Sequence, residues 1–278
     1  MIGSCFYVAI IELSETIGHE RASRTPTCKH LGMLLVHDAG PVRTVTLNRT
    51  EALNALTPDL LGMLEAALDE AAKADGVRVV VLTGAGRAFS AGVDLKALSA
   101  MPVTGGNVAD VLNGPARQVT ELLASMPKIT IAKVNGFCFT GALELALACD
   151  LMIVANEARM GDTHTKWGLR PTWGMSQRLV HAVGVTRARY LSYTAATFTG
   201  ADAFVWGMAS LSVPLAELDV RTDQLVAEVL ANNGSAQVAY KDMYRHAQDL
   251  GLSEGLAFEY RAKYRLDGAT ERLSTFGT

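Results

Sequence analysis

Charged residues are scarce in this chain, and neither sign of charge dominates. Only 19% of its 278 residues are charged and the formal net charge is −3, so the basic footprint of a nucleic-acid-binding protein is missing. Long apolar runs are missing as well, because none reaches the roughly 18 residues typical of a transmembrane helix. We therefore expect no nucleic-acid partner and no membrane span. The 49% share of hydrophobic residues predicts a well-buried core.

Cysteine is rare, and its spacing excludes the usual cysteine-based sites. The four cysteines form no C-x-x-C pair and no spacing typical of metal ligands, so we expect no metal site. Cys138 and Cys149 stand in apolar sequence, where cysteine behaves as a small apolar residue. Residues 5–11 are hydrophobic but lack a basic segment before them and a cleavage site after them, unlike a secretory signal peptide. These features predict a reduced protein of the cytoplasm.

Several catalytic and nucleotide-binding signatures are also absent. Residues 83–92, TGAGRAFSAG, contain Gly84 and Gly86, but Phe89 occupies the place of the third glycine in G-x-G-x-x-G. The nucleophile-elbow sequence G-x-S-x-G, the zinc-binding sequence H-E-x-x-H and the phosphate-binding P-loop do not occur. No redox cofactor is therefore expected.

The most informative stretch is residues 135–150, NGFCFTGALELALACD. A β-rich apolar run precedes it, and Gly136 and Gly141 allow the backbone to turn sharply. The residues after Gly141 are apolar on nearly every side, which is typical of a buried helix. Glu144 is the exception, and it stands in the first turn, where the helix dipole stabilises negative charge. A lone carboxylate in a buried helix predicts a catalytic role; the alternative is a residue that only complements the dipole.

Strands and helices are expected to alternate over the first two thirds of the chain, which predicts an α/β fold. Thr57 and Pro58 are a typical N-cap and first residue of a helix that ends at Lys73. Further strands are expected at 34–36, 43–47, 77–83, 129–134 and 151–155, and further helices from about 95, at 116–125 and from 142. Residues 101–115, rich in Gly, Asn and Pro, are expected to be mobile. After residue 186 the expected elements are helices at about 186–193, 200–206, 217–231, 235–249 and 253–264, with a strand near 210–213.

Three blocks of sequence carry a family resemblance: residues 79–96, 135–150 and 160–179. In this order and at this spacing the chain resembles, over residues 34–258, the enoyl-CoA hydratase/isomerase (crotonase) superfamily. The resemblance implies an α/β, crotonase-like spiral of ββα units at 33–195 and a helical C-terminal oligomerisation region at 196–278. It also implies a homotrimer or homohexamer. Residues 1–32 match nothing in the family, and we expect them to be a poorly ordered N-terminal extension.

Two glycine loops and one carboxylate carry the chemistry that the resemblance implies. An enolate formed from a thioester needs two preorganised N–H donors in a dry site. By resemblance, these oxyanion-hole donors are the backbone amides of Val93 and Gly141, and Glu144 is one of two acid/base residues. From the residues alone, both loops also fit ordinary strand-to-helix turns.

The second acid/base position departs from the usual family pattern, which has a Pro-Glu pair there. This chain has Asp162, Thr163 and His164, so His164 takes the place of the glutamate. A subset of hydratase-like relatives is similar in carrying a D-T-H triplet followed by a Trp-Gly segment. Histidine donates or accepts a proton near neutral pH, which makes His164 a candidate catalytic residue that Asp162 orients if the two side chains touch. The alternative is a hydrogen-bonded histidine of the loop.

The resemblance further implies a groove for the coenzyme A part of an acyl-CoA substrate, formed by Ala52, Leu53, Ala91, Asp94, Leu95 and Lys96. Trp167 and Trp173 are candidate walls of the acyl pocket. No separate cofactor is expected, since coenzyme A belongs to the substrate. The expected activity is the addition of water to a 2-enoyl-CoA. The alternatives are another thioester reaction, such as isomerisation or hydrolysis, and an acyl-CoA-binding protein without activity.

Overall fold

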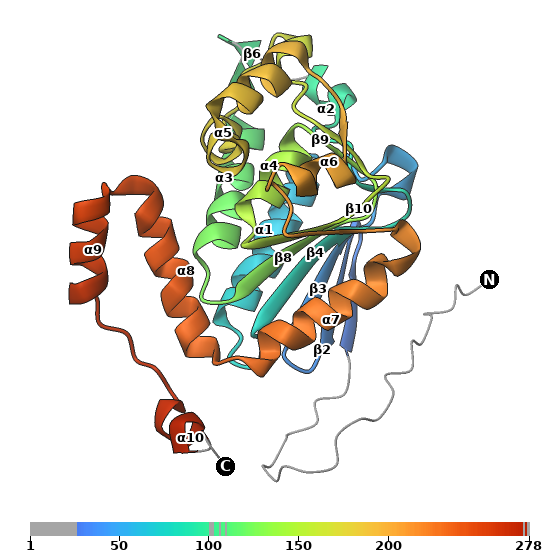
Figure 1. Cartoon of the computed structure of the whole chain (residues 1–278). Helices are drawn as coiled ribbons and strands as arrows, with labels where there is room; N and C mark the ends of the chain where they lie inside the picture. Colours follow the sequence, from blue (N-terminus) through green and yellow to red (C-terminus); the bar gives the residue numbers. More distant parts are fainter. Residues whose placement is uncertain (1–26, 100–102, 106, 109, 275, 277–278) are drawn as a thin grey trace.

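The computed structural model describes residues 27–99, 103–105, 107–108, 110–274 and 276. At its centre is a seven-stranded sheet with the strand order β1-β2-β3-β4-β8-β10-β13 (Figure 1). Strands β1 to β3 pair antiparallel, and every pair from β3 to β13 is parallel. All of β4 is buried, as expected of a strand covered on both faces. The strands are β1 (Thr27–Leu31), β2 (Leu34–Ala39), β3 (Val42–Leu47), β4 (Val79–Gly84), β8 (Ile129–Val134), β10 (Leu151–Ala155) and β13 (Leu211–Val213).

A second sheet contains four short strands in the order β12-β11-β9-β5. Each of β5, β9 and β11 follows a strand of the main sheet along the chain and precedes a helix, so the chain repeats a ββα unit. This repeat is the spiral that the family resemblance implies. The short strands are β5 (Ala88–Ser90), β9 (Phe137–Phe139), β11 (Arg159–Gly161) and β12 (Phe198–Thr199), and a separate hairpin is formed by β6 (Val103–Thr104) and β7 (Asn107–Val108).

The helices of the spiral bury apolar side chains between and around the sheets. Helix α1 begins at its expected residue because the Thr57 hydroxyl accepts a hydrogen bond from the Leu60 N–H at 3.2 Å. In α4 only Leu147 escapes full burial, which confirms the expected buried helix. These helices are α1 (Pro58–Lys73), α2 (Leu95–Ser99), α3 (Asp110–Ser125), α4 (Gly141–Ala148) and α5 (Met175–Thr194), with the 3-10 turns η1 (Thr50–Ala52) and η2 (Thr165–Trp167).

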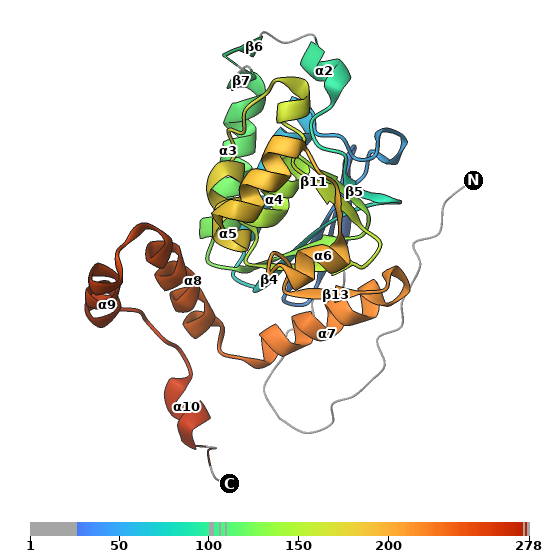
Figure 2. The ribbon, with the colours of Figure 1, turned by 45° about the horizontal axis from the view of Figure 1, so that its top comes forward.

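The C-terminal region is helical, as expected. It contains α6 (Gly200–Val205), η3 (Leu215–Glu217), α7 (Leu218–Ala231), α8 (Gly234–Asp249), α9 (Leu252–Arg261) and α10 (Ala269–Ser274). Figures 1 and 2 show α9 and α10 lying farther from the sheets than α8. Neither α9 nor α10 buries any residue. Among the described helices, none is long and apolar enough to cross a membrane.

Three expectations differ from the structure. The poorly ordered extension expected at 1–32 is wrong for Thr27–Leu31, because backbone pairing with β2 orders these residues as an exposed edge strand; residues 1–26 lie outside the described residues. Helix α3 begins at Asp110, so it takes up the end of the loop expected at 101–115. The helix expected at about 186–193 is present as the second segment of α5, but a first segment, which runs from Met175 to the bend at Gly184 (φ +74°), was not expected.

Candidate active site

The loop before α2 presents one backbone amide toward a pocket. Leu56 pairs with this loop through two bonds: its N–H donates to the Gly92 carbonyl at 2.8 Å, and its carbonyl accepts from the Asp94 N–H at 2.9 Å. In such a parallel bridge the intervening residue, Val93, directs its own N–H to the other side. Within the described residues no acceptor is bonded to that N–H. Gly92 has φ +91°, and a Cβ there would lie 2.6 Å from the Phe139 carbonyl oxygen, so the loop requires glycine.

The loop before α4 is strained and tightly held. Thr140 has φ +53°, which is unfavourable for a β-branched residue. Its N–H donates to the Gly161 carbonyl at 2.8 Å, and its hydroxyl lies 2.5 Å from that of Thr163. Gly141 begins α4, so its N–H is one of the unpaired donors of a helix start. A Cβ on Gly141 would lie 2.4 Å from the Trp173 ring, which leaves room only for glycine.

A pocket of about 340 Å³ lies against these two loops. Gly141 is not itself among the lining residues, but the preceding Thr140 is. The pocket therefore gathers groups from five separate parts of the chain: the loop before α2 with the start of α2, α3, the end of β9 with the start of α4, the segment between β11 and α5, and the segment between α5 and β12. Of the residues expected from the sequence, it is lined by Ala91, Val93, Leu95, Glu144, His164, Trp167 and Trp173.

Four residues expected in the coenzyme A groove lie outside this lining: Ala52, Leu53, Asp94 and Lys96. Asp94 has clear partners within the protein. Its Oδ2 pairs with Arg49 Nη2 at 3.1 Å, and its Oδ1 accepts from the Lys96 N–H at 3.0 Å. Burial acts to raise the pKa of Asp94, but the bonds from the start of α2 and from Arg49 outweigh it and lower the pKa. Asp94 is thus held as a carboxylate that organises this loop.

Glu144 is the buried carboxylate of the pocket, with 1% of its surface exposed. Its Oε1 accepts hydrogen bonds from the backbone N–H groups of Trp173 at 3.0 Å and Met175 at 2.9 Å. Its other oxygen, Oε2, lies 3.7 Å from Nε2 of His164. Burial raises the pKa of Glu144, and the nearby His164 and the two backbone donors offset part of that rise. One oxygen is therefore fixed by the protein, and the other faces a second titratable group.

His164 is buried and is held on the side away from Glu144. Its Nδ1 lies 2.7 Å from Oδ1 of Asp162, and its backbone N–H donates to the same oxygen at 3.2 Å. The other carboxylate oxygen of Asp162 accepts from the Ser192 hydroxyl at 2.6 Å. Burial acts to raise the pKa of Asp162, but the bonds from His164 and Ser192 prevail and lower it. The contact between Asp162 and His164, which the sequence left open, is made.

Two site residues were not identified from the sequence, Ser192 and Asn113. Asn113 lies buried on α3, where its Oδ1 accepts from Nε1 of Trp173 at 2.9 Å and from the hydroxyl of Thr172 at 3.0 Å. It thereby fixes the indole that packs on Gly141. Both residues stand far along the chain from the groups they contact, so no local pattern in the sequence marks them.

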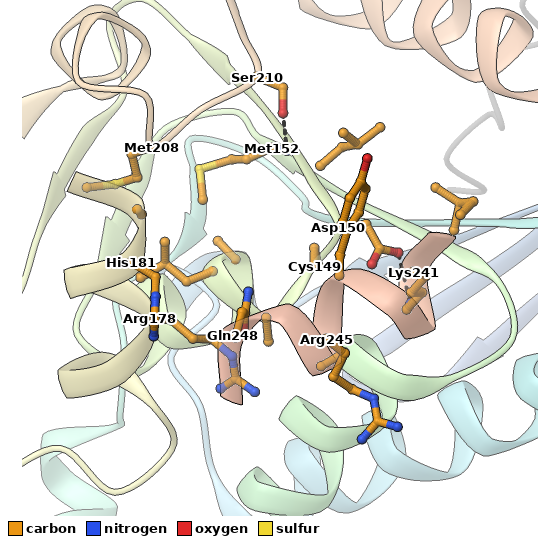
Figure 3. A pocket seen from close by; sticks show the side chains of 18 of the residues that line it. Cys149, Asp150, Met152, Arg178, His181, Met208, Ser210, Lys241, Arg245 and Gln248 are labelled. Atoms are coloured by element: carbon orange, nitrogen blue, oxygen red, sulfur yellow. Dashed lines mark hydrogen bonds and ion pairs between the residues drawn. The ribbon is translucent and has the colours of Figure 1, made fainter. Parts of the chain in front are cut away.

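A larger pocket of about 610 Å³ lies at the opposite end of α4, between α4, α5 and α8 (Figure 3). Figure 3 shows Lys241 of α8 pointing to Asp150, and the two are paired at 2.8 Å. Lys241 also donates to the carbonyls of Leu123 and Lys128, both at 2.9 Å. The Lys241 ammonium and its three acceptors therefore meet one another's hydrogen-bonding needs within the protein. The smaller pocket, with its facing carboxylate and imidazole, is the better candidate for chemistry.

Known proteins resemble this chain in both sequence and fold. The family model for enoyl-CoA hydratase/isomerase matches residues 38–272. A probable enoyl-CoA hydratase of Rhizobium meliloti is 35% identical over 228 residues, which cover 82% of this chain and 87% of the relative. The short-chain-enoyl-CoA hydratase of Clostridium acetobutylicum is 31% identical over 233 residues, which cover 84% of this chain and 88% of that relative.

A solved structure of a Thermobifida fusca protein in complex with acetoacetyl-CoA has a TM-score of 0.75 to this chain at 29% identity. The match covers 87% of this chain and 95% of the other. The relatives and the family model span most of the chain, including both glycine loops, Glu144 and the loop of His164. The chain therefore belongs to the enoyl-CoA hydratase/isomerase family.

Proposed function

We propose that this protein is an enoyl-CoA hydratase, which adds water across the double bond of a 2-enoyl-CoA thioester. One observation carries the proposal: Oε2 of Glu144 and Nε2 of His164 lie 3.7 Å apart in a pocket that Val93 also lines. Hydration needs one group to take a proton from water and another to deliver a proton to carbon. The hydratase names of the relatives favour the same reaction.

The backbone amides of Val93 and Gly141 serve as the oxyanion hole in this proposal. When water adds to the β-carbon, negative charge develops on the thioester oxygen. Two fixed N–H donors in a site with little water stabilise that charge without reorganisation. The strained backbone at Thr140 and the required glycine at position 92 both serve to hold these amides in place.

Glu144 and His164 divide the proton transfers. Glu144 accepts a proton as the water oxygen bonds to the β-carbon, and the π electrons move to form the enolate. Protonated His164 then gives its Nε2 proton to the α-carbon, which restores the thioester carbonyl. The proton that Glu144 took from water passes to Nε2 of His164, 3.7 Å from Oε2, so both groups return to their starting states. The Asp162 carboxylate behind the ring stabilises the imidazolium, while the two backbone donors on Glu144 hold its free oxygen toward the pocket.

The coenzyme A part of the substrate is proposed to bind along Ala52, Leu53, Ala91, Asp94, Leu95 and Lys96. The similar Thermobifida fusca structure, which contains acetoacetyl-CoA, supports an acyl-CoA ligand. Because Asp94 is already paired with Arg49, we assign it the role of shaping the loop that carries the Val93 amide. We propose no metal and no separate cofactor.

The D-T-H triplet places the chain, in this proposal, in a hydratase-like subgroup that uses His164 in place of the second glutamate. A homotrimer or homohexamer and a cytoplasmic location stay predictions from the resemblance. Exposed apolar side chains on α8 and α9 support an assembly, since a lone chain would leave them in water: Tyr240, Tyr244, Leu252, Leu256 and Tyr260.

The test is a spectrophotometric assay of crotonyl-CoA and of longer 2-enoyl-CoAs, in which hydration removes the absorbance of the conjugated thioester. Glu144→Gln should lower kcat by at least about 10²-fold with KM nearly unchanged, since the amide keeps the shape but accepts no proton. Glu217→Gln, at an exposed glutamate, is the matched control. Wild-type-like kcat in Glu144→Gln would remove Glu144 from the mechanism. Release of free thiol by the wild type would indicate hydrolysis, and binding of acyl-CoA without turnover would indicate a binding protein.

A further inference from the structure

The imidazole of His164 is tied to the end of α5 by a chain of hydrogen bonds. Ser192, in the last turn of α5, donates its hydroxyl proton to Oδ2 of Asp162 at 2.6 Å. Oδ1 of Asp162 lies 2.7 Å from Nδ1 of His164. The Ser192 carbonyl, in turn, accepts from the hydroxyl of Thr165, the residue after His164, at 2.6 Å. One residue of α5 thus holds both the side-chain partner of the imidazole and the loop that carries it.

We propose that Ser192 and Asp162 are positioning residues that fix the tautomer and the ring orientation of His164, so that Nε2 alone exchanges protons in the pocket. This inference rests on the proposed role of His164 in hydration. An ionised carboxylate only accepts hydrogen bonds, so Nδ1 must carry a proton in both charge states of the ring. In the neutral ring Nε2 is then a bare acceptor, and in the imidazolium it is a donor.

The Asp162 carboxylate needs Ser192 to hold this orientation. The pKa of Asp162 is lowered in spite of burial, and the bonds from His164 and Ser192 are what overcome the desolvation. Without the Ser192 hydroxyl, Oδ2 loses its donor, and the carboxylate is held only through Oδ1, by the ring and the backbone N–H of His164. The ring would then be held less firmly at 3.7 Å from Glu144. At metal sites, removing a group that orients a ligand in this way typically lowers metal affinity or activity about 10- to 100-fold, and we expect a similar effect on activity here.

The test compares four variants of the full chain by turnover and by NMR. Ser192→Ala should lower kcat for hydration by about 10-fold with KM unchanged, and Asp162→Asn should lower it by about 100-fold. Nitrogen-15 NMR of protein with labelled histidine rings should show His164 as a single tautomer with the proton on Nδ1 in the wild type. Asp162→Asn should show a mixture, because an amide also donates. The His164 signal is identified by its loss in His164→Gln.

Ser212→Ala is the matched control, because its hydroxyl also donates at 2.6 Å to a side-chain oxygen, that of Asn156, but belongs to β13. Equal kcat in Ser192→Ala, Ser212→Ala and wild type, with one unchanged His164 tautomer, would overturn the inference. A lower melting temperature in Ser192→Ala with normal turnover would also overturn the inference. If the wild type hydrates nothing, the proposed function fails, while a fixed Nδ1–H tautomer that loosens in Asp162→Asn still supports the positioning of the ring.

Discussion

At the residue scale, the active site gathers groups that a stable core avoids. Thr140 holds a left-handed backbone conformation, and Glu144 is a buried carboxylate. A strained residue of this kind costs roughly 1–3 kcal/mol and persists only where its surroundings hold it. Here the hydroxyl pair with Thr163 and the bond to Gly161 hold Thr140. The strained turn at Thr140 lets α4 begin at Gly141, so that the Gly141 amide and the Glu144 side chain lie in the same first turn of the helix.

His164 gives the sharpest test of chemistry at this scale. His164→Ala should lower kcat by roughly 10²-fold or more, and the pH–rate profile should lose one limb, because a proton donor is removed. His164→Glu should restore part of the activity, since it recreates the two-carboxylate pair of the usual family pattern. Steady-state kinetics over a range of pH measure both effects. An alanine variant that turns over like wild type and only melts earlier would mark His164 as a packing residue.

Glu144 also links pH to stability. Because burial raises the pKa of Glu144 in the folded state, the folded protein binds its proton more tightly than the unfolded chain does. The side chain therefore contributes most stability below its unfolded pKa, and this contribution is lost as pH rises through the folded pKa. Glu144→Gln carries no charge. Its melting temperature relative to wild type should rise as the pH increases above the ordinary pKa of a glutamate, as measured by calorimetry. A difference that stays constant or falls would contradict the raised pKa.

At the scale of elements, the start of α4 and the end of α5 build the site from opposite sides. The first turn of α4 supplies Gly141 and Glu144, and the last turn of α5 supplies Ser192. The first residue of α5, Met175, donates its N–H to Glu144. The two helices thus set the positions of both proposed acid/base groups, so a shift between them would change the distance from Glu144 to His164.

Helix α8 is attached to the spiral by a buried cation. Lys241, with 7% of its side chain exposed, pairs with Asp150 and donates to two backbone carbonyls. Lys241→Met would remove one donor from each carbonyl and the cation from Asp150, which is 23% exposed and keeps two bonds from Thr130. The cost should therefore be roughly 3 kcal/mol, at the lower end of the range for a buried pair. The free energy of unfolding from denaturant titration measures the loss.

The control is Lys73→Met, which breaks the exposed pair with Asp69 and should cost less than about 1 kcal/mol. Equal effects of the two substitutions would show that the Lys241 contacts contribute no more than a surface ion pair. A large loss at Lys241 alone would identify it as the main attachment of α8.

At the scale of the whole molecule, the chain has a dense α/β body and a helical region that extends from it (Figure 2). No residue of α9 or α10 is fully buried within the chain. Isolated short helices are marginal in water, and packing of an apolar face supplies most of their stability in proteins. The exposed Leu252, Leu256 and Tyr260 of α9 therefore fit the proposed assembly into a homo-oligomer.

Removal of residues 1–32 should have little effect on stability. Every residue of β1 is exposed, and its ion pair from Lys29 to Glu70 is half exposed, so that pair contributes at most about 1 kcal/mol. A chain that begins at Met33 should melt within about 2–4 °C of the full chain, the shift expected for that energy. Light scattering should give the same assembly. A much larger drop would show that the pairing of β1 with β2 contributes more to stability than this ion pair.

Local pattern was enough to predict most of the longer helices and strands. Helix α1 with its Thr57 cap, the buried α4 and the strand at residues 151–155 follow from residue type and spacing. The family resemblance brought in the ββα spiral and the roles of Val93, Gly141, Glu144 and His164, which stay predictions until they are tested. The short second sheet was missed, because two or three residues carry too little periodicity to mark a strand.

Only the tertiary structure decided which groups touch. The sequence places Asp162 two residues before His164 but does not say that they bond, and it separates Ser192 from Asp162 by a helix. Pairing of β1 and the bond from Met175 to Glu144 likewise depend on segments that meet through the fold. Periodicity indicates on which face of its helix or strand a residue lies. The distance between two elements is set by packing of the whole core. For that reason the sequence alone identified the candidate residues of this site, and the folded chain determined their geometry.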